Sequence, residues 1–416
     1  MIDNKKILAL DFDYSSAHRF SALLPVLRKN NFQMKLICDD KSFLEKEKIF
    51  DGLLIKNITS YPSRNFLNIL KIENPDLIIV LNMNLLKIRS LNRCCKFLGI
   101  PIILLEHGVV SAGGLTNSKR FDAGKALKKR YIRILKGELI SYFFSYISYL
   151  IYTKASLKSW FFLFLEVFLK LIGKDFATED WKYSAYCVYL ESDKKKLLSQ
   201  LKNSIDKNKI HVVGNYDLNL FNIDYESFNS YKRENKSNSI LYIDSDCVER
   251  TFYHNENVYL DYIVKVRNIV NDNGFKLLIK LHPNSLKKKI DYKLSNLNIN
   301  NISNEQFIPT LKVSKYVIGE PSSINVMVCL TGTPILTPVL KPFNKKRYGI
   351  IMEQYPNRYD FSDYQELENI LKFGKDKSQN LEISNWIDKF AGPLPPSDYP
   401  IRVFNVIKKV LNTKKV

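Results

Sequence analysis

Short, nearly continuous apolar segments recur along the chain and alternate with stretches of helical periodicity. In the first half they include KILALDFD, PDLIIVLN and PIILLEHG, and in the second half ILYIDSD, FKLLIKLHP and KYVIGE. A parallel strand with helices on both faces has this character, because neither side of the strand meets water. The sequence therefore predicts an α/β fold built on parallel sheets.

The length of the chain predicts two domains. A chain of 416 residues is too long for one ordinary core, and domains of about 150 to 200 residues each are expected. A polar and charged stretch that follows Gly214-Asn215 is typical of a linker. We therefore expect a first domain at 1–214, a linker at 215–238, a second domain at 239–400, and a C-terminal helix with a basic tail at 401–416.

Polar residues follow two predicted strands of the second half, FKLLIKL and KYVIG. At the carboxyl ends of parallel strands, the following helix offers unpaired backbone N–H groups and the positive end of its dipole, which favours anions. Alternatively, the serines only cap the next helix and the histidine is structural. The predicted nucleotide- and phosphate-binding residues are His282, Pro283, Glu320, Ser322 and Ser323.

A second candidate site lies at Glu106-His107-Gly108, again at a predicted strand end. A carboxylate or an imidazole on a loop kept open by glycine can act as a general base. Consecutive residues in extended backbone point in opposite directions, so only one of Glu106 and His107 is expected to reach a ligand. Gly108, Asp244 and Asp246 are possible cleft-lining residues, although a solvated turn explains the two aspartates equally well.

The segment from Ser239 to Pro338 carries a family resemblance. KLHPN followed by KYVIGEPSSINVMVCLTGTPIL resembles the C-terminal half of bacterial surface-polysaccharide glycosyltransferases of the GT-B fold. It is similar in particular to sialyl- and polysialyltransferases, whose HP and SS or ST motifs bind the phosphate of a CMP-linked sugar, and to CDP-glycerol glycerophosphotransferases. The resemblance implies two Rossmann-like domains facing each other across a cleft, with the acceptor bound by the first and the donor by the second.

The resemblance also implies an activity. We expect an inverting glycosyltransferase that moves a sugar from a CMP-sialic-acid-like donor to a hydroxyl of a surface glycan, such as capsule, lipooligosaccharide or O-antigen. The HG histidine of the glycerophosphotransferases favours His107 as base, whereas the sialyltransferases use an acidic residue in a DDG- or EDG-like motif, from which EHG departs; the choice stays open. One alternative is a CDP-glycerol or polyol phosphotransferase of teichoic-acid-like or capsule polymer synthesis. Another is a non-catalytic scaffold of a polysaccharide export complex.

No carboxylate pair stands at a convincing place for a metal ion. Fixed hydrogen-bond donors can neutralise the phosphate of the donor instead. We therefore expect that neither a metal nor another cofactor is required.

A basic and aromatic insertion, residues 115–180, interrupts the first domain. Eight basic residues and one acid lie between Lys119 and Lys136, followed by the apolar runs LISYFFSYISYLIY and WFFLFLEVFLKLI. Neither run reaches the roughly 20 residues that a spanning helix needs. Aromatic rings beside basic side chains favour an interfacial position on an anionic membrane. The alternatives are a helical hairpin buried against the first domain and an interface with a partner.

Charge and cysteine usage complete the expectations. The excess of 63 Lys and Arg over 42 Asp and Glu, a net charge of +21, favours polyanions or an anionic membrane face, but no nucleic-acid-binding motif is present. The six cysteines lack ligand spacing and are expected to be buried thiols. The chain begins with a strand pattern, so no signal peptide is expected. We expect a cytoplasmic protein, peripheral on the inner face of the cell membrane, whose partners are a nucleotide-sugar donor, a glycan or lipid-linked acceptor and anionic lipid.

Overall fold

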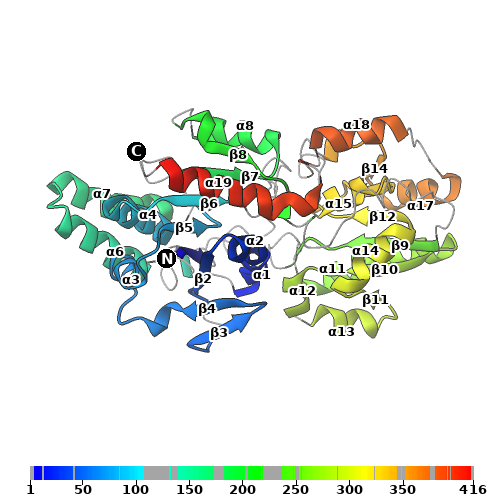
Figure 1. Ribbon diagram of the computed structural model, residues 1–416. Helices are drawn as coiled ribbons and strands as arrows, with labels where there is room; N and C mark the ends of the chain where they lie inside the picture. Colours follow the sequence, from blue (N-terminus) through cyan, green and yellow to red (C-terminus); the bar gives the residue numbers. More distant parts are fainter. Residues whose placement is uncertain are drawn as a thin grey trace. The chain divides into compact units, whose positions relative to one another are not determined.

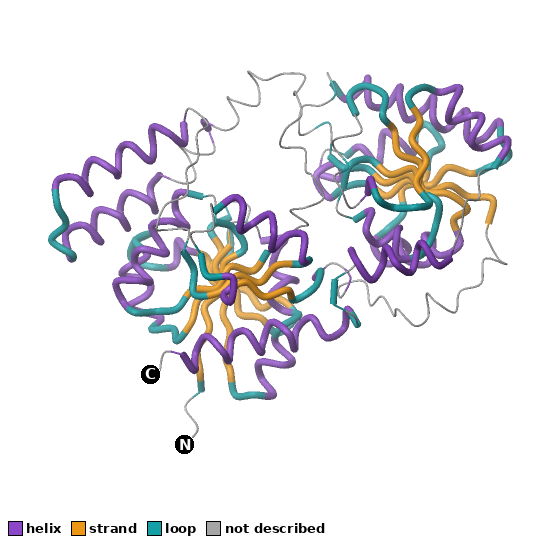
Figure 2. Tube along the Cα trace, turned by 90° about the horizontal axis from the view of Figure 1, so that it is seen from above, coloured by secondary structure: helices purple, strands orange, loops and turns teal. Residues whose placement is uncertain are grey.

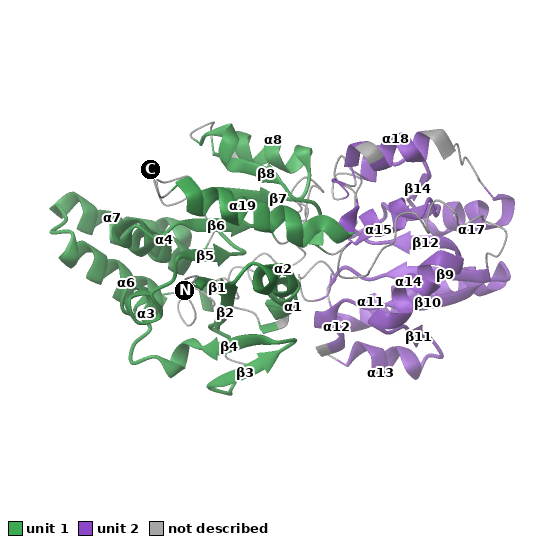
Figure 3. Ribbon diagram, viewed as in Figure 1, with its two compact units in different colours: residues 1–108, 129–216, 397–416 green, residues 109–128, 217–396 purple. Residues whose placement is uncertain are grey.

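In the computed structural model, the chain forms two compact α/β units (Figures 1 and 3). Unit 1 comprises residues 1–108, 129–216 and 397–416, and unit 2 comprises residues 109–128 and 217–396. The structure describes all residues except 1–3, 12–13, 41–42, 84, 107–130, 133–138, 172–181, 202–204, 217, 219–236, 247, 249–252, 254, 288, 323, 344–347, 349–351, 375–379, 391, 394 and 414–416.

Unit 1 is built on an eight-stranded sheet in the order β3-β4-β2-β1-β5-β6-β7-β8. All neighbouring strands are parallel except β3 and β4. Every residue of β5, β6 and β7 is buried, which confirms the prediction drawn from continuous apolar segments. The strands are β1 (Lys5–Asp11), β2 (Phe32–Cys38), β3 (Glu47–Phe50), β4 (Leu53–Asn57), β5 (Leu77–Val80), β6 (Ile102–Leu105), β7 (Ala185–Val188) and β8 (Ile210–Val212).

Two helices of unit 1 begin or end at a capping residue that the sequence supplies. The side chain of Asn65 accepts from Leu67 N at the start of α3, and Gly99 ends α4 in the left-handed region at φ 65°, where glycine carries no steric cost. Helices lie on both sides of the strands in Figure 2. They are α1 (Ala17–Ser21), α2 (Leu24–Lys29), α3 (Phe66–Glu73), α4 (Leu86–Leu98), α6 (Leu139–Tyr152), α7 (Leu157–Leu171), α8 (Glu191–Gln200) and α19 (Tyr399–Thr413), with 3-10 turns η1 (Tyr14–Ser16), η2 (Ile58–Ser60) and η7 (Lys207–Lys209).

Unit 2 contains a six-stranded sheet in the order β11-β10-β9-β12-β13-β14, and all neighbouring strands are parallel. Its core is formed by apolar side chains of β9, β10 and β12 and of the helix α11 that packs on them. The strands are β9 (Ser237–Ile243), β10 (Lys276–Lys280), β11 (Asn300–Asn301), β12 (Ser314–Gly319), β13 (Ile335–Pro338) and β14 (Arg358–Phe361).

Three helices of unit 2 begin at a polar N-cap residue. Asn255, Ser303 and Asp363 are N-caps whose side chains accept from the first turn of α11, α14 and α17, as short polar side chains commonly do. The helices are α11 (Glu256–Asp272), α12 (Pro283–Lys287), α13 (Ile290–Ser295), α14 (Asn304–Val313), α15 (Asn325–Leu330), α17 (Tyr364–Phe373) and α18 (Asn380–Phe390); the turn η10 (Pro396–Asp398) precedes α19.

The two apolar runs of the insertion form the helices α6 and α7. One face of the hairpin packs on α4 of the same unit through α6, and α6 and α7 also pack on each other. The alternative of a hairpin packed on the first domain is therefore confirmed for that face. The other face of the hairpin leaves large apolar side chains in contact with solvent. Among them are Phe161 and Leu157 of α7, whose exposed fractions are 64% and 88%. No helix among the described residues is both long and apolar enough to cross a membrane.

A buried ionic cluster fastens this hairpin to α4. Glu166 of α7 is 2% exposed, and its carboxylate lies 2.9 Å from Arg93 Nη2 and 3.5 Å from Arg89 Nη1, both on α4. The hydroxyl of Tyr142 on α6 donates to the same carboxylate at 2.6 Å. Three helices are therefore joined at one carboxylate in the interior of unit 1.

Candidate functional site

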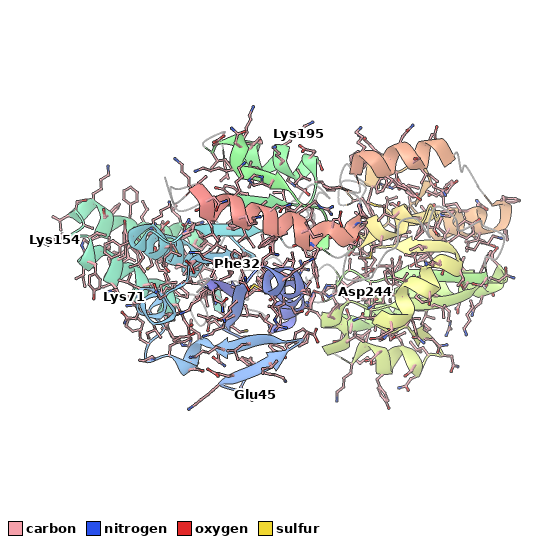
Figure 4. The ribbon with its side chains drawn as sticks, in the orientation of Figure 1. Phe32, Glu45, Lys71, Lys154, Lys195 and Asp244 are labelled. Carbon is pink, nitrogen blue, oxygen red and sulfur yellow. The ribbon has the colours of Figure 1, made fainter. Side chains whose placement is uncertain are left out.

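The candidate phosphate site lies at the carboxyl edge of the unit 2 sheet. From β9 the chain passes to β10 on one side, and later to β12 on the other. Ligands of open α/β sheets bind where the strand order reverses in this way. Asp244 and Glu320 directly follow β9 and β12, and His282 follows β10 after one residue, Leu281. All three therefore stand at this switch point. Figure 4 shows Asp244 at the end of β9.

Asp244 ties the loop after β9 to the loop after β10. One oxygen of its carboxylate accepts from the backbone N of His282 at 3.1 Å and from Ser285 Oγ at 2.5 Å. The other oxygen accepts from the backbone N of Asp246 at 3.0 Å. Both aspartates are buried, at 4% and 3% exposure, so the alternative of a solvated turn is wrong. The two aspartates therefore hold the loop after β10 through hydrogen bonds instead of lining an open surface.

The imidazole of His282 has a defined orientation. Its Nδ1 accepts a hydrogen bond from the backbone N of Asn284 at 3.2 Å, and the Asn284 amide donates to Asp246 Oδ2 at 2.9 Å. A neutral imidazole that accepts at Nδ1 carries its proton on Nε2. The side chain of His282 is 30% exposed. The loop therefore holds a partly exposed imidazole whose Nε2–H can donate to an anion.

Proline at position 283 suits this loop. It is the first residue of α12, a position where the absence of a backbone N–H has no cost and where the fixed φ angle suits a helix. The carbonyl of His282 accepts from Ser285 N and Leu286 N. The imidazole is thus anchored at the point where the strand turns into the helix.

Glu320 lies beneath these loops. It has no exposed surface, its Oε2 accepts from the backbone N and from Oγ of Ser245, both at 2.8 Å, and the Tyr242 hydroxyl donates to its other oxygen. Burial and the nearby Asp244 carboxylate raise the pKa of Glu320 to about 8, so the carboxyl is largely protonated at neutral pH. Because its side chain has no exposed surface, Glu320 does not make the direct contact with a nucleotide that the sequence predicted. It positions the loop after β9 through Ser245 instead.

Two residues that the sequence patterns did not single out hold Glu320 in place. The amide of Asn325 donates to the Glu320 carbonyl oxygen at 2.8 Å. A Cβ atom on Gly319 would lie 2.8 Å from Asn325 Oδ1 and 2.8 Å from Ile335 Cδ1. Only glycine allows this approach, because a contact of that length forces an atom of the core to move.

The serine motif lies beside this loop. Helix α15 begins at Asn325, and its N-cap residue is Ile324, which makes no side-chain cap. The alternative that Ser322 caps the helix is therefore wrong. Ser322 is partly exposed, and its carbonyl accepts from Asn325 N at 3.3 Å. Ser323 lies outside the described residues.

The candidate base lies at the carboxyl edge of the unit 1 sheet. Glu106 follows β6; its backbone N donates to Cys187 O at 2.9 Å, and one oxygen of its carboxylate accepts from Tyr189 N at 3.0 Å. His107 and Gly108 lie outside the described residues. The choice between Glu106 and His107 as base therefore stays open.

The described residues contain no group of three or more His, Cys, Asp or Glu side chains arranged to hold a metal ion. Of the six cysteines, Cys38, Cys94, Cys95, Cys187 and Cys329 are buried free thiols, which confirms that expectation for these five. Burial raises the pKa values of their thiols. Such thiols are poor nucleophiles and poor metal ligands.

The sequence matches no family model and no curated protein. Solved structures do match over nearly the whole chain. The UDP-GlcNAc 2-epimerase of Methanocaldococcus jannaschii, in complex with UDP-GlcNAc and UDP, has a TM-score of 0.53 at 14% identity and covers 97% of this chain and 99% of its own. MnaA of S. aureus with UDP has a TM-score of 0.54 at 14% identity, covering 98% and 97%. The wall teichoic acid polymerase TagF has a TM-score of 0.55 at 10% identity, covering 99% and 90%.

At such low identity these matches describe the fold alone. They agree with two α/β units, each built on a sheet whose strands are parallel apart from the β3–β4 pair. The chain has a GT-B-like fold.

Proposed function

We propose that the protein is a nucleotide-dependent transferase of surface-polymer biosynthesis. The observation that carries this proposal is the anchored imidazole of His282 at the switch point of unit 2, with Nδ1 occupied by Asn284 N. Such a group donates to a phosphate oxygen without reorganising when negative charge develops on it. The nucleotides bound by the similar M. jannaschii epimerase and by MnaA, and the polymer made by TagF, support the same class of substrate.

In the proposed reaction, a base of unit 1, His107 or Glu106, takes the proton of an acceptor hydroxyl. The hydroxyl oxygen attacks the anomeric carbon of the donor sugar from the side opposite the phosphate, and the bond between this carbon and the phosphate oxygen breaks. The leaving nucleotide receives the electron pair, and His282, Ser322 and Ser323 stabilise the resulting charge. Displacement in one step inverts the configuration at the anomeric carbon.

Two donors are compatible with this chemistry. A CMP-sialic-acid-like donor is implied by the resemblance of the HP and SS motifs to those of the sialyltransferases. A CDP-glycerol or related polyol donor is favoured by the likeness to TagF, and in that case the acceptor oxygen attacks phosphorus and CMP leaves. Both reactions need the same base and phosphate-binding groups.

The donor can be identified in two steps. A thermal-shift series with CMP, CDP, UDP and GDP tests the nucleotide, and we expect stabilisation by the cytidine nucleotides. Product analysis with CMP-sialic acid and CDP-glycerol then separates sugar transfer from polyol-phosphate transfer. Nucleotide binding without turnover of any activated sugar or polyol would favour the scaffold of an export complex.

We also propose that the exposed face of the α6–α7 hairpin lies on an anionic membrane surface. Among residues 139–171 the only acid is Glu166, which is buried, whereas Lys154 and Lys158 are exposed. The exposed face thus combines aromatic rings with positive charge and has no negative charge, which suits anionic lipid. An enzyme held there would meet a lipid-linked acceptor on the inner face of the cell membrane.

A further inference from the structure

An arginine stands at the carboxyl edge of the unit 1 sheet, outside the candidate phosphate site. Arg19 lies in α1, the helix after β1. Its Nη1 donates to the hydroxyl of Tyr189, which follows β7, at 3.1 Å. Its guanidinium carbon lies 5.4 Å from the ring centroid of Tyr216, which follows β8. Three segments that follow different strands therefore meet around one cation.

The connection that carries Arg19 leaves β1 at the switch point of unit 1. Strand β1 lies between β2 and β5, so the chain leaves β1 toward one side of the sheet and returns to its other side. A crevice at the carboxyl ends of such strands is where open α/β sheets bind ligands. Arg19 lies in α1, eight residues after the end of β1, and is only partly buried, so its charge can reach a ligand at this edge.

The tyrosines fix the geometry of this arginine. Tyr189 and Tyr216 are 0% and 1% exposed, so neither presents a ring face to a ligand. The Tyr216 hydroxyl donates to the backbone oxygen of His18 at 2.8 Å. The ring centroids of His18 and Tyr216 lie 5.5 Å apart. The buried aromatic residues thus orient α1 and its guanidinium, which reduces the side-chain entropy that binding would remove.

The same cluster touches the candidate base. The backbone N of Tyr189 donates to the Glu106 carboxylate, while its hydroxyl accepts from Arg19. One residue therefore contacts both the candidate base and the cation.

We propose that Arg19 binds an anionic group, phosphate or carboxylate, of the acceptor. This inference rests on the proposed transferase function. A guanidinium is a planar group whose N–H donors bind two oxygens of a carboxylate or phosphate at once. A neutral sugar hydroxyl has one oxygen and no charge, so it does not need a guanidinium. The acceptor is then a charged polymer, such as a glycan with acidic sugars or a chain of polyol phosphates. The phosphate of the donor is bound by His282, as proposed above.

The test is calorimetric titration of the full chain with four probes: lactose, sialyllactose, a glycerol phosphate trimer and CMP. We expect at least one of the two anionic acceptor probes to bind more tightly than lactose. Arg19→Gln should weaken that binding about tenfold, the size expected for loss of a charged hydrogen-bonding group. The affinity for CMP should not change.

Arg28→Gln is the matched control. Arg28 lies in the next helix, is exposed, and donates to Gly52 O at the amino end of β4, so its loss should alter no titration. Tyr189→Phe removes only the hydroxyl that holds Arg19 and should weaken the anionic probe less than Arg19→Gln does. This variant also provides the test if Arg19→Gln does not fold.

Several results would overturn the proposal. These are equal binding of lactose and both anionic probes by the wild type, unchanged binding in Arg19→Gln, or a loss of CMP binding in Arg19→Gln while the anionic acceptor probe still binds. The last result would assign Arg19 to the donor. A wild-type protein that binds an anionic probe but transfers nothing from any donor would refute the transferase function and leave the role of Arg19 standing.

Discussion

At the scale of single residues, Glu320 is the most informative side chain. A carboxyl between a strand end and two polar loops has the sequence signature of a ligand contact. Its pKa is raised to about 8 by burial, however, and its hydrogen bonds go to Ser245 and Tyr242. Glu320 thus fixes the loop after β9, whose Asp244 in turn accepts from the backbone N of His282.

The raised pKa of Glu320 predicts a dependence of stability on pH. Between its ordinary value of 4.5 and about 8, the folded protein holds a proton that the unfolded chain has released. The free energy of unfolding should therefore fall as pH rises through this window, by up to about 1.4 kcal/mol per pH unit. Glu320→Gln keeps the shape and cannot titrate, so its slope in urea unfolding from pH 5 to 8.5 should be shallower. Equal slopes for the two proteins would contradict the assignment.

His282→Ala should weaken the binding of the cytidine nucleotide. The imidazole donates to a charged phosphate in the proposed complex, and loss of such a bond costs about 1.5 to 3 kcal/mol, or roughly tenfold to a hundredfold in affinity. His211→Ala, which changes a histidine of β8 in unit 1, is the control and should bind as the wild type does. Full affinity in His282→Ala would remove the phosphate-binding assignment.

Steady-state kinetics of His107→Ala and Glu106→Ala should identify the base. A base acts in the transition state, so its removal should lower kcat far more than it raises KM for the donor. We expect this pattern for one of the two variants only. The same modest effect in both would show that neither residue is the base.

At the scale of elements, the α6–α7 hairpin depends on one buried carboxylate. Glu166 lies against Arg89 and Arg93 of α4, and the guanidinium of Arg93 also lies 3.6 Å from the ring centroid of Tyr146. A buried ion pair adds little net stability over an apolar pair, but removal of one partner leaves a buried charge without compensation. The cluster therefore specifies where the hairpin packs.

Glu166→Ala should lower the free energy of unfolding of unit 1 by about 3 to 5 kcal/mol, because two buried guanidinium groups lose this carboxylate. Urea unfolding followed by circular dichroism measures the change. Glu45→Ala removes an exposed acid of the same unit and should alter stability by less than about 0.5 kcal/mol. Similar effects of the two substitutions would show that the cluster does not hold the hairpin.

At the scale of the whole molecule, the net charge of +21 and the exposed face of the hairpin both suit the proposed anionic membrane surface. The tip of the hairpin carries Lys154, which projects from its turn (Figure 4). Each basic side chain near an anionic surface contributes on the order of 1 kcal/mol. Charge and exposed aromatic area together can hold the protein on a membrane that no described helix spans.

Flotation with anionic vesicles should therefore show binding that falls as salt rises. Lys154→Glu with Lys158→Glu should reduce vesicle binding, because both lysines border the exposed aromatic face. Lys195→Glu with Lys207→Glu makes the same change of net charge elsewhere in unit 1 and should have a smaller effect. Equal losses in the two double variants would show that the hairpin is not the docking surface.

The sequence by itself determined the class of fold and the position of the candidate site. Continuous apolar segments show which strands are buried, and polar residues after β10 and β12 mark the carboxyl edge of unit 2, because these signals are local. Short or exposed elements escape such patterns: β3, with the mostly exposed sequence EKIF, is too short to give a continuous apolar segment.

Only the tertiary structure decided what each polar residue does. Glu320, Asp244 and Asp246 look like ligand contacts in the sequence, and they become buried supports because β9, β10 and β12 are neighbours in space. The grouping of Arg19 with Tyr189 and Tyr216 joins residues far apart in the chain. Burial and hydrogen-bond partners depend on contacts between distant segments, and local patterns of residues carry no information about such contacts.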